Sequence, residues 1–121
     1  MRVLAHRPAG PLGEWVDSIW YFEGAAIPHA MERILPSGTM QLLVNLEADE
    51  LRWWSDGDVC HLPGSAVAGA FARPFAIETA HQRVVTGVLF APGGAAGFLP
   101  GSMRAFANTH VAFSDLPAAY G

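Results

Sequence analysis

The stretch ERILPSGTMQLLVNL, residues 32–46, places two strand-like runs on either side of a Pro-Ser-Gly sequence. Pro36 and Gly38 suit the second and fourth positions of a type I turn. The chain is therefore expected to reverse or kink sharply between two strands. The second run is nearly continuous in apolar residues and holds only two carboxamides, which raises the question of where those carboxamides point.

Alternation along the second run separates two faces, because successive side chains of a strand point to opposite sides of a sheet. One face is wholly apolar and is expected in the core: Met40, Leu42, Val44 and Leu46. The other face carries the polar groups: Thr39, Gln41, Leu43 and Asn45. This second face either meets solvent or lines a cavity. Its polar groups are neutral, whereas faces exposed to solvent usually carry charged side chains. We therefore keep the hypothesis that this face lines a cavity for an uncharged or polar ligand.

A second hairpin is predicted around Asp56-Gly57, the strongest short hairpin signal. If these two residues form the loop, Trp54 pairs with Val59 and Trp53 with Cys60. One hairpin face is then apolar: Leu51, Trp53, Cys60 and Leu62. The other face is mixed: Arg52, Trp54, Val59 and His61. Cys60 is accordingly expected to be a buried small hydrophobe rather than a reactive thiol.

Strands dominate the first three-quarters of the chain and short helices its end. Residues 11–18 suggest a short N-terminal helix or turn, residues 19–24 an aromatic strand and residues 83–91 a central strand. PGGAAG at 92–97 lacks the features of a phosphate loop, and its glycines are expected to let a short helix pack closely against the sheet. The predicted class is mainly β (α+β): an antiparallel β-barrel or sandwich with a short N-terminal helix and short C-terminal helices.

Composition limits the range of functions. The 121 residues favour a single domain, residues 1–121, with a net charge of −4 and arginine as its only cation. An acidic domain without a basic run is a poor binder of nucleic acid or of acidic membranes. No apolar run approaches the roughly 20 residues that a membrane span needs. One cysteine and no secretory signal favour a cytoplasmic protein.

No arrangement of residues predicts catalysis, a metal site or another cofactor. The histidines are scattered, and no two stand at the two-, three- or four-residue spacing that presents paired ligands to one metal. Serines next to glycine lack the context of a nucleophile elbow. The chain is therefore predicted not to be an enzyme.

Two groups of residues are candidates for ligand binding. Trp54 lies on the mixed hairpin face beside Arg52 and His61, where an aromatic ring could meet a ligand or partner. Along the first stretch the candidates are Arg33, Gln41 and Asn45. Ordinary packing or solvent exposure remains the alternative for each of the six.

Two motifs together resemble a known family. RILPSGTMQLLVNL, residues 33–46, resembles the R-x-L-P-[DS]-G-x-x-[DEQ]-L-[VI]-F-x-L run of a poorly characterised N-terminal domain of bacterial AraC-type transcriptional regulators. Residues 87–116, GVLFAPGGAAGFLPGSMRAFANTHVAFSDL, are similar to a later segment of that domain. WVDSIWYFEG also looks like its first helix and strand. The sequence departs from the pattern near its end, where LPAAYG replaces a more usual Leu-Trp-Gly-like start of the next helix.

The resemblance implies a cupin-like β-barrel that acts as a sensory or dimerisation domain, with a small-molecule effector and a homodimer as its expected partners. In such regulators a C-terminal helix-turn-helix domain binds DNA, and that domain is absent from this chain. No catalytic residue or metal ligand carries over; metal-binding cupins usually show a His-x-His pair that this sequence lacks. The alternatives are a stand-alone cupin-like binding protein or enzyme, and a pure dimerisation module with a filled barrel.

Overall fold

A computed structural model of the chain shows short antiparallel strands joined by turns. It describes residues 2–24, 31–34, 38–78, 82–99 and 103–116. The described strands are β1 (Arg2–His6), β2 (Val16–Glu23), β3 (Met31–Ile34), β4 (Gln41–Asn45), β5 (Leu51–Ser55), β6 (Asp58–Leu62), β7 (Ser65–Ala68), β8 (Phe75–Glu78), β9 (Val84–Phe90) and β10 (His110–Ala112). The described helices are short 3-10 turns: η1 (Gly10–Glu14), η3 (Gly94–Gly97), η4 (Met103–Phe106) and η5 (Phe113–Asp115).

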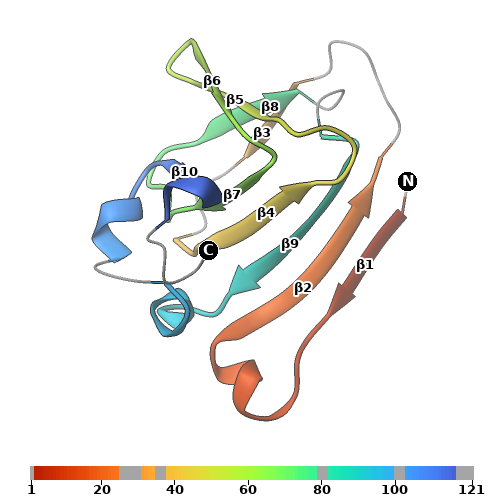
Figure 1. Ribbon diagram of the computed structural model, residues 1–121, viewed down its shortest axis with the longest axis vertical. Helices are drawn as coiled ribbons and strands as arrows, with labels where there is room; N and C mark the ends of the chain where they lie inside the picture. The colour runs from red at the N-terminus through yellow and green to blue at the C-terminus, as the bar shows by residue number, and fades with distance from the viewer. Residues whose placement is uncertain (1, 25–30, 35–37, 79–81, 100–102, 117–121) are drawn as a thin grey trace.

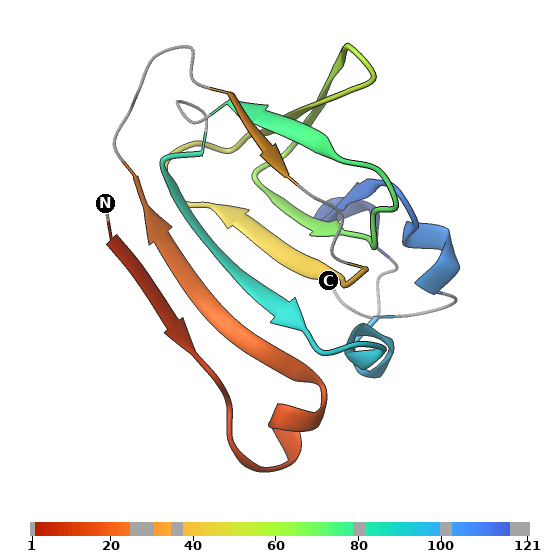
Figure 2. The ribbon, with the colours of Figure 1, turned by 180° about the vertical axis from the view of Figure 1, so that it is seen from behind.

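The strands form two antiparallel sheets. The larger sheet has the order β1-β2-β9-β4-β7-β10, and the smaller has the order β3-β8-β5-β6. Figures 1 and 2 show the smaller sheet gathered at one end of the larger one, with the η1 end of β1 and β2 projecting away from it. Strand pairing among the described residues stays within each sheet, so the two sheets do not close into one barrel. The predicted antiparallel, mainly β architecture is confirmed.

The predicted short helices are not confirmed as α-helices. At the N-terminal end, the five-residue η1 stops at Glu14 and β2 begins at Val16, inside the segment that was expected to be a short helix or turn. Gly10 and Gly13 weaken an α-helix here, and the β-branched and aromatic residues that follow favour a strand. The predicted C-terminal helices are likewise 3-10 turns of three or four residues.

The β5–β6 hairpin has the register expected from the sequence. Trp53 pairs with Cys60 and Trp54 with Val59. Asp56 and Gly57 both take positive φ values, 51° and 82°, as a two-residue hairpin loop of this kind requires. Cys60 is only half-buried, so its burial is less complete than predicted.

The main packed core lies on the outer face of the larger sheet, the face turned away from the smaller sheet. Its buried members come from the strands and from the turns that cover them: Val16, Met40, Val67, Phe90, Ala95, Leu99 and Phe106. Gly94 lets η3 approach closely, because a Cβ there would collide with the backbone carbonyl of Trp15. The predicted close packing at the glycines of this segment is therefore confirmed, although the helix is a 3-10 turn.

The apolar face predicted for residues 40–46 is only partly in this core. Met40 is buried and Leu42 packs against the cluster, but Leu46 is 53% exposed. β4 ends at Asn45, so Leu46 lies in the following turn and no longer follows the strand alternation. The prediction of a buried Leu46 was wrong for this reason.

Candidate functional site

A cleft of about 330 Å³ lies between the two sheets. Its size falls at the lower end of the range for small-molecule sites, roughly 300–1,000 Å³. The residues that line it come from both sheets and from the segment before β9: Val3, Trp20, Phe22, Ile34, Gln41, Leu43, Leu51, Trp53, Phe75, Ile77, Gln82, Val85 and His110. We call this space the cleft.

Strand alternation explains which residues reach the cleft. On β4, Gln41 and Leu43 line it, whereas Leu42 between them packs on the outer face. On β5, Leu51 and Trp53 line it and leave the intervening Arg52 on the opposite side. The period-2 pattern of each strand therefore sends one set of side chains into the space between the sheets.

Gly87 shapes the floor of the cleft. It pairs with Trp20 on β2 and with Leu43 on β4. A Cβ at Gly87 would lie 2.5 Å from Cζ2 of Trp20 and 2.6 Å from the carbonyl oxygen of Leu42. The missing side chain thus gives the indole of Trp20 room to lie against the central strand.

The most distinctive polar group in the cleft is His110, the first residue of β10. Its side chain is only 8% exposed and lies among aromatic rings. Its ring centroid is 4.1 Å from that of Trp53, 5.1 Å from that of Phe71 and 5.3 Å from that of Phe75. Nδ1 is buried and has no hydrogen-bond partner among the described residues.

Burial also determines the charge of His110. Desolvation lowers the pKa of its imidazole from the usual 6.5 to about 4, because the protonated form is disfavoured away from water. The ring is therefore neutral at pH 7 and offers one N–H donor and one acceptor nitrogen. An aromatic environment with a neutral histidine suits a ligand that needs a directional hydrogen bond rather than an ion pair.

The other polar side chains of the cleft are two carboxamides. Gln41 projects from β4, and Gln82 precedes β9. Nε2 of Gln82 donates to the backbone carbonyl of Arg52 at 3.3 Å, which ties this side chain to the smaller sheet. Among the described residues that line the cleft there is no Asp, Glu, Lys or Arg. The cleft is therefore apolar, with three neutral polar groups besides the indole N–H groups of Trp20 and Trp53.

A second concavity, of about 410 Å³, lies on the outer face of the larger sheet. We call it the groove. All of its described lining residues are apolar: Leu12, Val16, Ile19, Leu42, Val67, Val88, Phe90, Phe98, Leu99, Phe113 and Leu116. The groove is slightly larger than the cleft, but it offers no side-chain hydrogen-bonding group to orient a ligand. The cleft is therefore the better candidate for specific binding.

The structure separates the two carboxamides predicted as a pair on the first stretch. Gln41 lines the cleft, which is the cavity alternative of the prediction. Asn45 is 8% exposed and its amide is engaged in the turn that follows β4. Its Nδ2 donates to the carbonyl of Glu50 at 2.8 Å, and its Oδ1 accepts from the backbone N–H of Glu47 at 3.0 Å. Asn45 therefore holds the turn.

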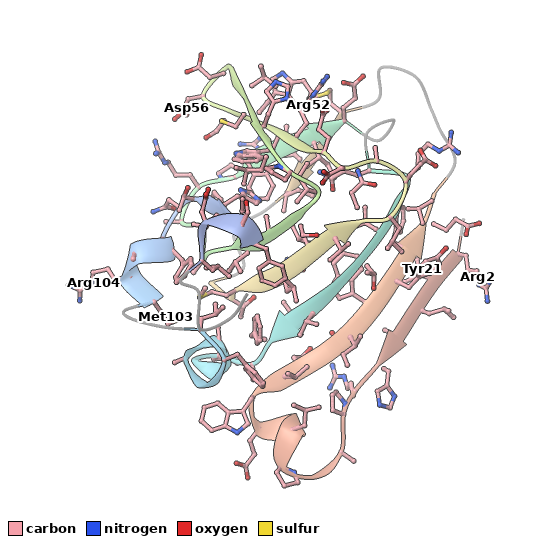
Figure 3. All side chains as sticks on the ribbon, in the orientation of Figure 1. Arg2, Tyr21, Arg52, Asp56, Met103 and Arg104 are labelled. Atoms are coloured by element: carbon pink, nitrogen blue, oxygen red, sulfur yellow. The ribbon has the colours of Figure 1, made fainter. Side chains whose placement is uncertain are left out.

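The other four predicted site residues lie outside the cleft. Arg33 is exposed on β3, where its neighbour Ile34 is the residue that reaches the cleft. Arg52, Trp54 and His61 share the opposite face of the hairpin, as the register predicted, but that face points away from the larger sheet. Figure 3 shows Arg52 on the hairpin near the top of the view, and its guanidinium lies 3.0 Å from the carboxylate of Glu50. The structure does not bring these four residues together with Gln41 in the cleft.

Sequence reasoning missed the aromatic wall and the histidine of the cleft. Leu51 and Trp53 were assigned to an apolar face, and both side chains are buried there, but they also line the cleft. Alternation along residues 19–24 could have placed Trp20 and Phe22 on one face. Nothing in the sequence marks His110, because β10 is only three residues long and its environment comes from distant strands.

Two further features were sought among the described residues. No group of three or more His, Cys, Asp or Glu side chains there is placed to hold a metal ion. No described helix has the length and apolar character to cross a membrane.

Comparison with known proteins gives the family of the chain. No curated protein matches it, and no solved structure does either. Residues 4–112 match a family described as Domain of unknown function (DUF6597). This match covers most of the sequence, including every strand that contributes to the cleft except the first residues of β1. The chain belongs to the family described as Domain of unknown function (DUF6597).

Proposed function

We propose that this chain is the effector-sensing domain of a bacterial AraC-type transcriptional regulator and that it binds a small molecule, without changing it chemically, in the cleft. The observation that carries the proposal is the cleft itself, an aromatic and apolar space of about 330 Å³ with three neutral polar groups. Small-molecule sites typically combine apolar walls with a few polar groups that fix orientation.

The regulatory part of the proposal is supported by the resemblance of residues 33–46 and 87–116 to the N-terminal domain of AraC-type regulators. We also propose, on the same resemblance, that the two sheets are arranged as in a cupin. DNA binding would come from a helix-turn-helix domain outside this chain, in a homodimeric protein of the cytoplasm. The acidic charge of −4 agrees with a domain that does not itself contact DNA.

The position of the cleft suggests how a ligand would act. A ligand shifts a conformational equilibrium only if it binds one state more tightly than another. A molecule in the cleft would touch both sheets at once, for example Leu43 on the larger sheet and Trp53 on the smaller. It would therefore favour the spacing of the sheets that best fits its shape, and an attached domain could respond to that spacing.

The test is a ligand screen of uncharged small molecules against the wild-type protein, read by ligand-observed NMR, followed by titration of two variants. Leu43→Trp would fill the cleft, and Leu42→Trp would fill the groove from the neighbouring position of the same strand. Ligands are expected to lose more than about tenfold in affinity in Leu43→Trp and to keep it in Leu42→Trp. Equal affinity in both variants, or a screen without any ligand, would refute the proposal. Circular dichroism of both variants controls for folding.

A further inference from the structure

The charge of the cleft restricts the class of ligand that it can hold. No acidic or basic side chain lines it among the described residues. Taking a carboxylate, phosphate or ammonium group into such a space would strip it of water without supplying a counter-charge, which is strongly unfavourable. The ligand is therefore expected to be uncharged in the part that enters the cleft.

The aromatic side chains that line the cleft also restrict the shape of the ligand. Trp20 and Phe22 of the larger sheet and Trp53 and Phe75 of the smaller sheet all line the space. Aromatic side chains favour offset-stacked or edge-to-face contact with other rings. An engineered cavity of about 150 Å³ in another protein holds benzene. The cleft has about twice that volume, so it has room for a ligand of one or two rings.

His110 supplies the point of polar contact. Its Nδ1 lies buried without a hydrogen-bond partner among the described residues, and its ring borders the cleft beside Trp53. Because Nδ1 is fully enclosed, a ligand in the cleft meets it only if the imidazole turns towards the cleft. A buried polar atom without a partner destabilises a protein, so a ligand that satisfies it in this way gains affinity. A neutral imidazole nitrogen is a donor in one tautomer and an acceptor in the other. A hydroxyl group can serve either tautomer, because it both donates and accepts.

Together these observations identify a ligand class. We propose that the cleft takes an uncharged ring compound that bears a hydroxyl group, and that this hydroxyl hydrogen-bonds to the imidazole of His110. The inference rests on the proposed small-molecule binding in the cleft and adds the chemistry of the ligand and the residue that recognises it. The competing explanation is that Nδ1 stays enclosed by the protein and that His110 has no part in recognition.

Three probes of matched shape test the inference: β-naphthol, naphthalene and β-naphthoate. They carry a neutral hydroxyl, no polar group and an anion at pH 7. Each is titrated into the wild-type protein with tryptophan fluorescence as the readout, since Trp20 and Trp53 line the cleft. Naphthol is expected to bind at least about tenfold more tightly than either of the other two.

His110→Phe tests the role of the histidine, because it keeps a ring but removes both nitrogens. This variant is expected to weaken naphthol about tenfold and to change naphthalene less than about threefold. His110→Leu provides a second variant if the phenylalanine packs differently. His6→Phe is the matched control, because His6 is exposed on the edge strand β1 and faces away from the cleft. It is expected to leave the affinity for all three probes unchanged.

Imidazole ¹⁵N NMR of the wild-type protein gives a readout that does not depend on any variant folding. Naphthol is expected to shift the Nδ1 resonance of His110, and naphthalene is not. Equal losses of naphthol and naphthalene in His110→Phe, an unchanged Nδ1 resonance, or naphthoate binding as tight as naphthol would each overturn the inference. So would a failure of all three probes to bind. A charged ligand that Leu43→Trp excludes would overturn this inference and leave the proposed sensing function standing.

Discussion

Both faces of the larger sheet are apolar, but the outer face carries the main packed core and the inner face lines the cleft. The outer face is covered by η3 and η4, and its side chains pack into a cluster that includes Val67, 1% exposed, and Phe106, 6% exposed. The inner face looks across the cleft at the smaller sheet and leaves space between its side chains and theirs. Neighbouring residues of one strand, Leu42 and Leu43, therefore belong to a packed core and to a candidate binding site.

The difference shows where stability and binding reside in this fold. Both faces border open space, the groove on the outer side and the cleft on the inner side. On the outer face, however, η3 and η4 add close neighbours, and burial against them supplies both hydrophobic and dispersion energy. The inner face keeps instead the polar groups that a packed core would exclude, among them Gln41 and His110. We expect substitutions on the outer face to act on stability, and substitutions on the inner face to act mainly on binding.

The largest expected effect is on the packed side. Phe106→Ala should lower the free energy of unfolding by about 3–5 kcal/mol, because it leaves a cavity in the outer core. Phe75→Ala, at a half-buried ring beside the cleft, should lower it by roughly half as much. Urea denaturation of both variants measures the difference. Equal losses would mean that the inner face is packed as tightly as the outer one.

The next largest expected effect is a pH dependence of the free energy of unfolding that arises from His110. Its pKa is about 4 in the folded protein and 6.5 in the unfolded chain, so between these values the unfolded state takes up a proton that the folded state does not. Stability is therefore undiminished above pH 6.5 and falls as the pH is lowered towards 4. The loss is about 1.4 kcal/mol per pH unit and about 3 kcal/mol in total.

The measurement compares the free energy of unfolding of wild type and His110→Phe between pH 7 and about pH 4. Subtracting the two curves isolates the contribution of His110. The wild type should lose the stated energy relative to the variant. Parallel curves for wild type and His110→Phe would show that His110 is solvated in the folded protein.

A smaller effect on stability is expected to distinguish Asn45 from Gln41, the two carboxamide residues of β4. Asn45→Ala removes the side-chain hydrogen bonds that hold the turn after β4 and should lower the free energy of unfolding by about 2 kcal/mol. Its affinity for naphthol should not change. Gln41→Ala should do the reverse, with a stability change below about 0.5 kcal/mol and weaker naphthol binding. A loss of binding in Asn45→Ala at unchanged stability would contradict the assignment of these residues to turn and cleft.

The smallest expected effect on stability is at Gly57, in the loop of the β5–β6 hairpin, which belongs to neither face of the larger sheet. Gly57 has a φ of 82°, and a Cβ added there would meet nothing within 4 Å. Gly57→Ala should therefore lower the free energy of unfolding by only about 1 kcal/mol, the backbone strain of a left-handed residue. Thermal denaturation gives the value. A much larger loss would mean that the hairpin contributes to the cleft beyond the two side chains of β5 that line it.

The features that the sequence predicted correctly are those encoded by near neighbours. The hairpin register follows from Asp56-Gly57 and from the apolar alternation on either side, and the structure has that register. The assignment of Gln41 and Leu43 to one face of a strand follows from alternation alone. Both signals reside within a few residues, so no knowledge of the remaining chain is needed to interpret them.

The candidate site could not be predicted in the same way, because it depends on which strands face each other. His110 becomes significant only when β10 joins the edge of the larger sheet and brings it against Trp53 and Phe75. Alternation placed Trp54 and Trp53 on opposite faces but could not say which face looks across the cleft. Asn45 shows the converse, since its local turn contacts override the alternation that pointed to a cavity.

The most direct test is an isotope-filtered NOESY spectrum of the labelled protein with bound β-naphthol. The binding account predicts contacts from the naphthol ring to the methyl groups of Leu43, Leu51 and Val85, all of which line the cleft. Contacts to Leu42, Val88 and Leu99 instead would place the ligand in the groove on the other face of the same sheet and would contradict the account.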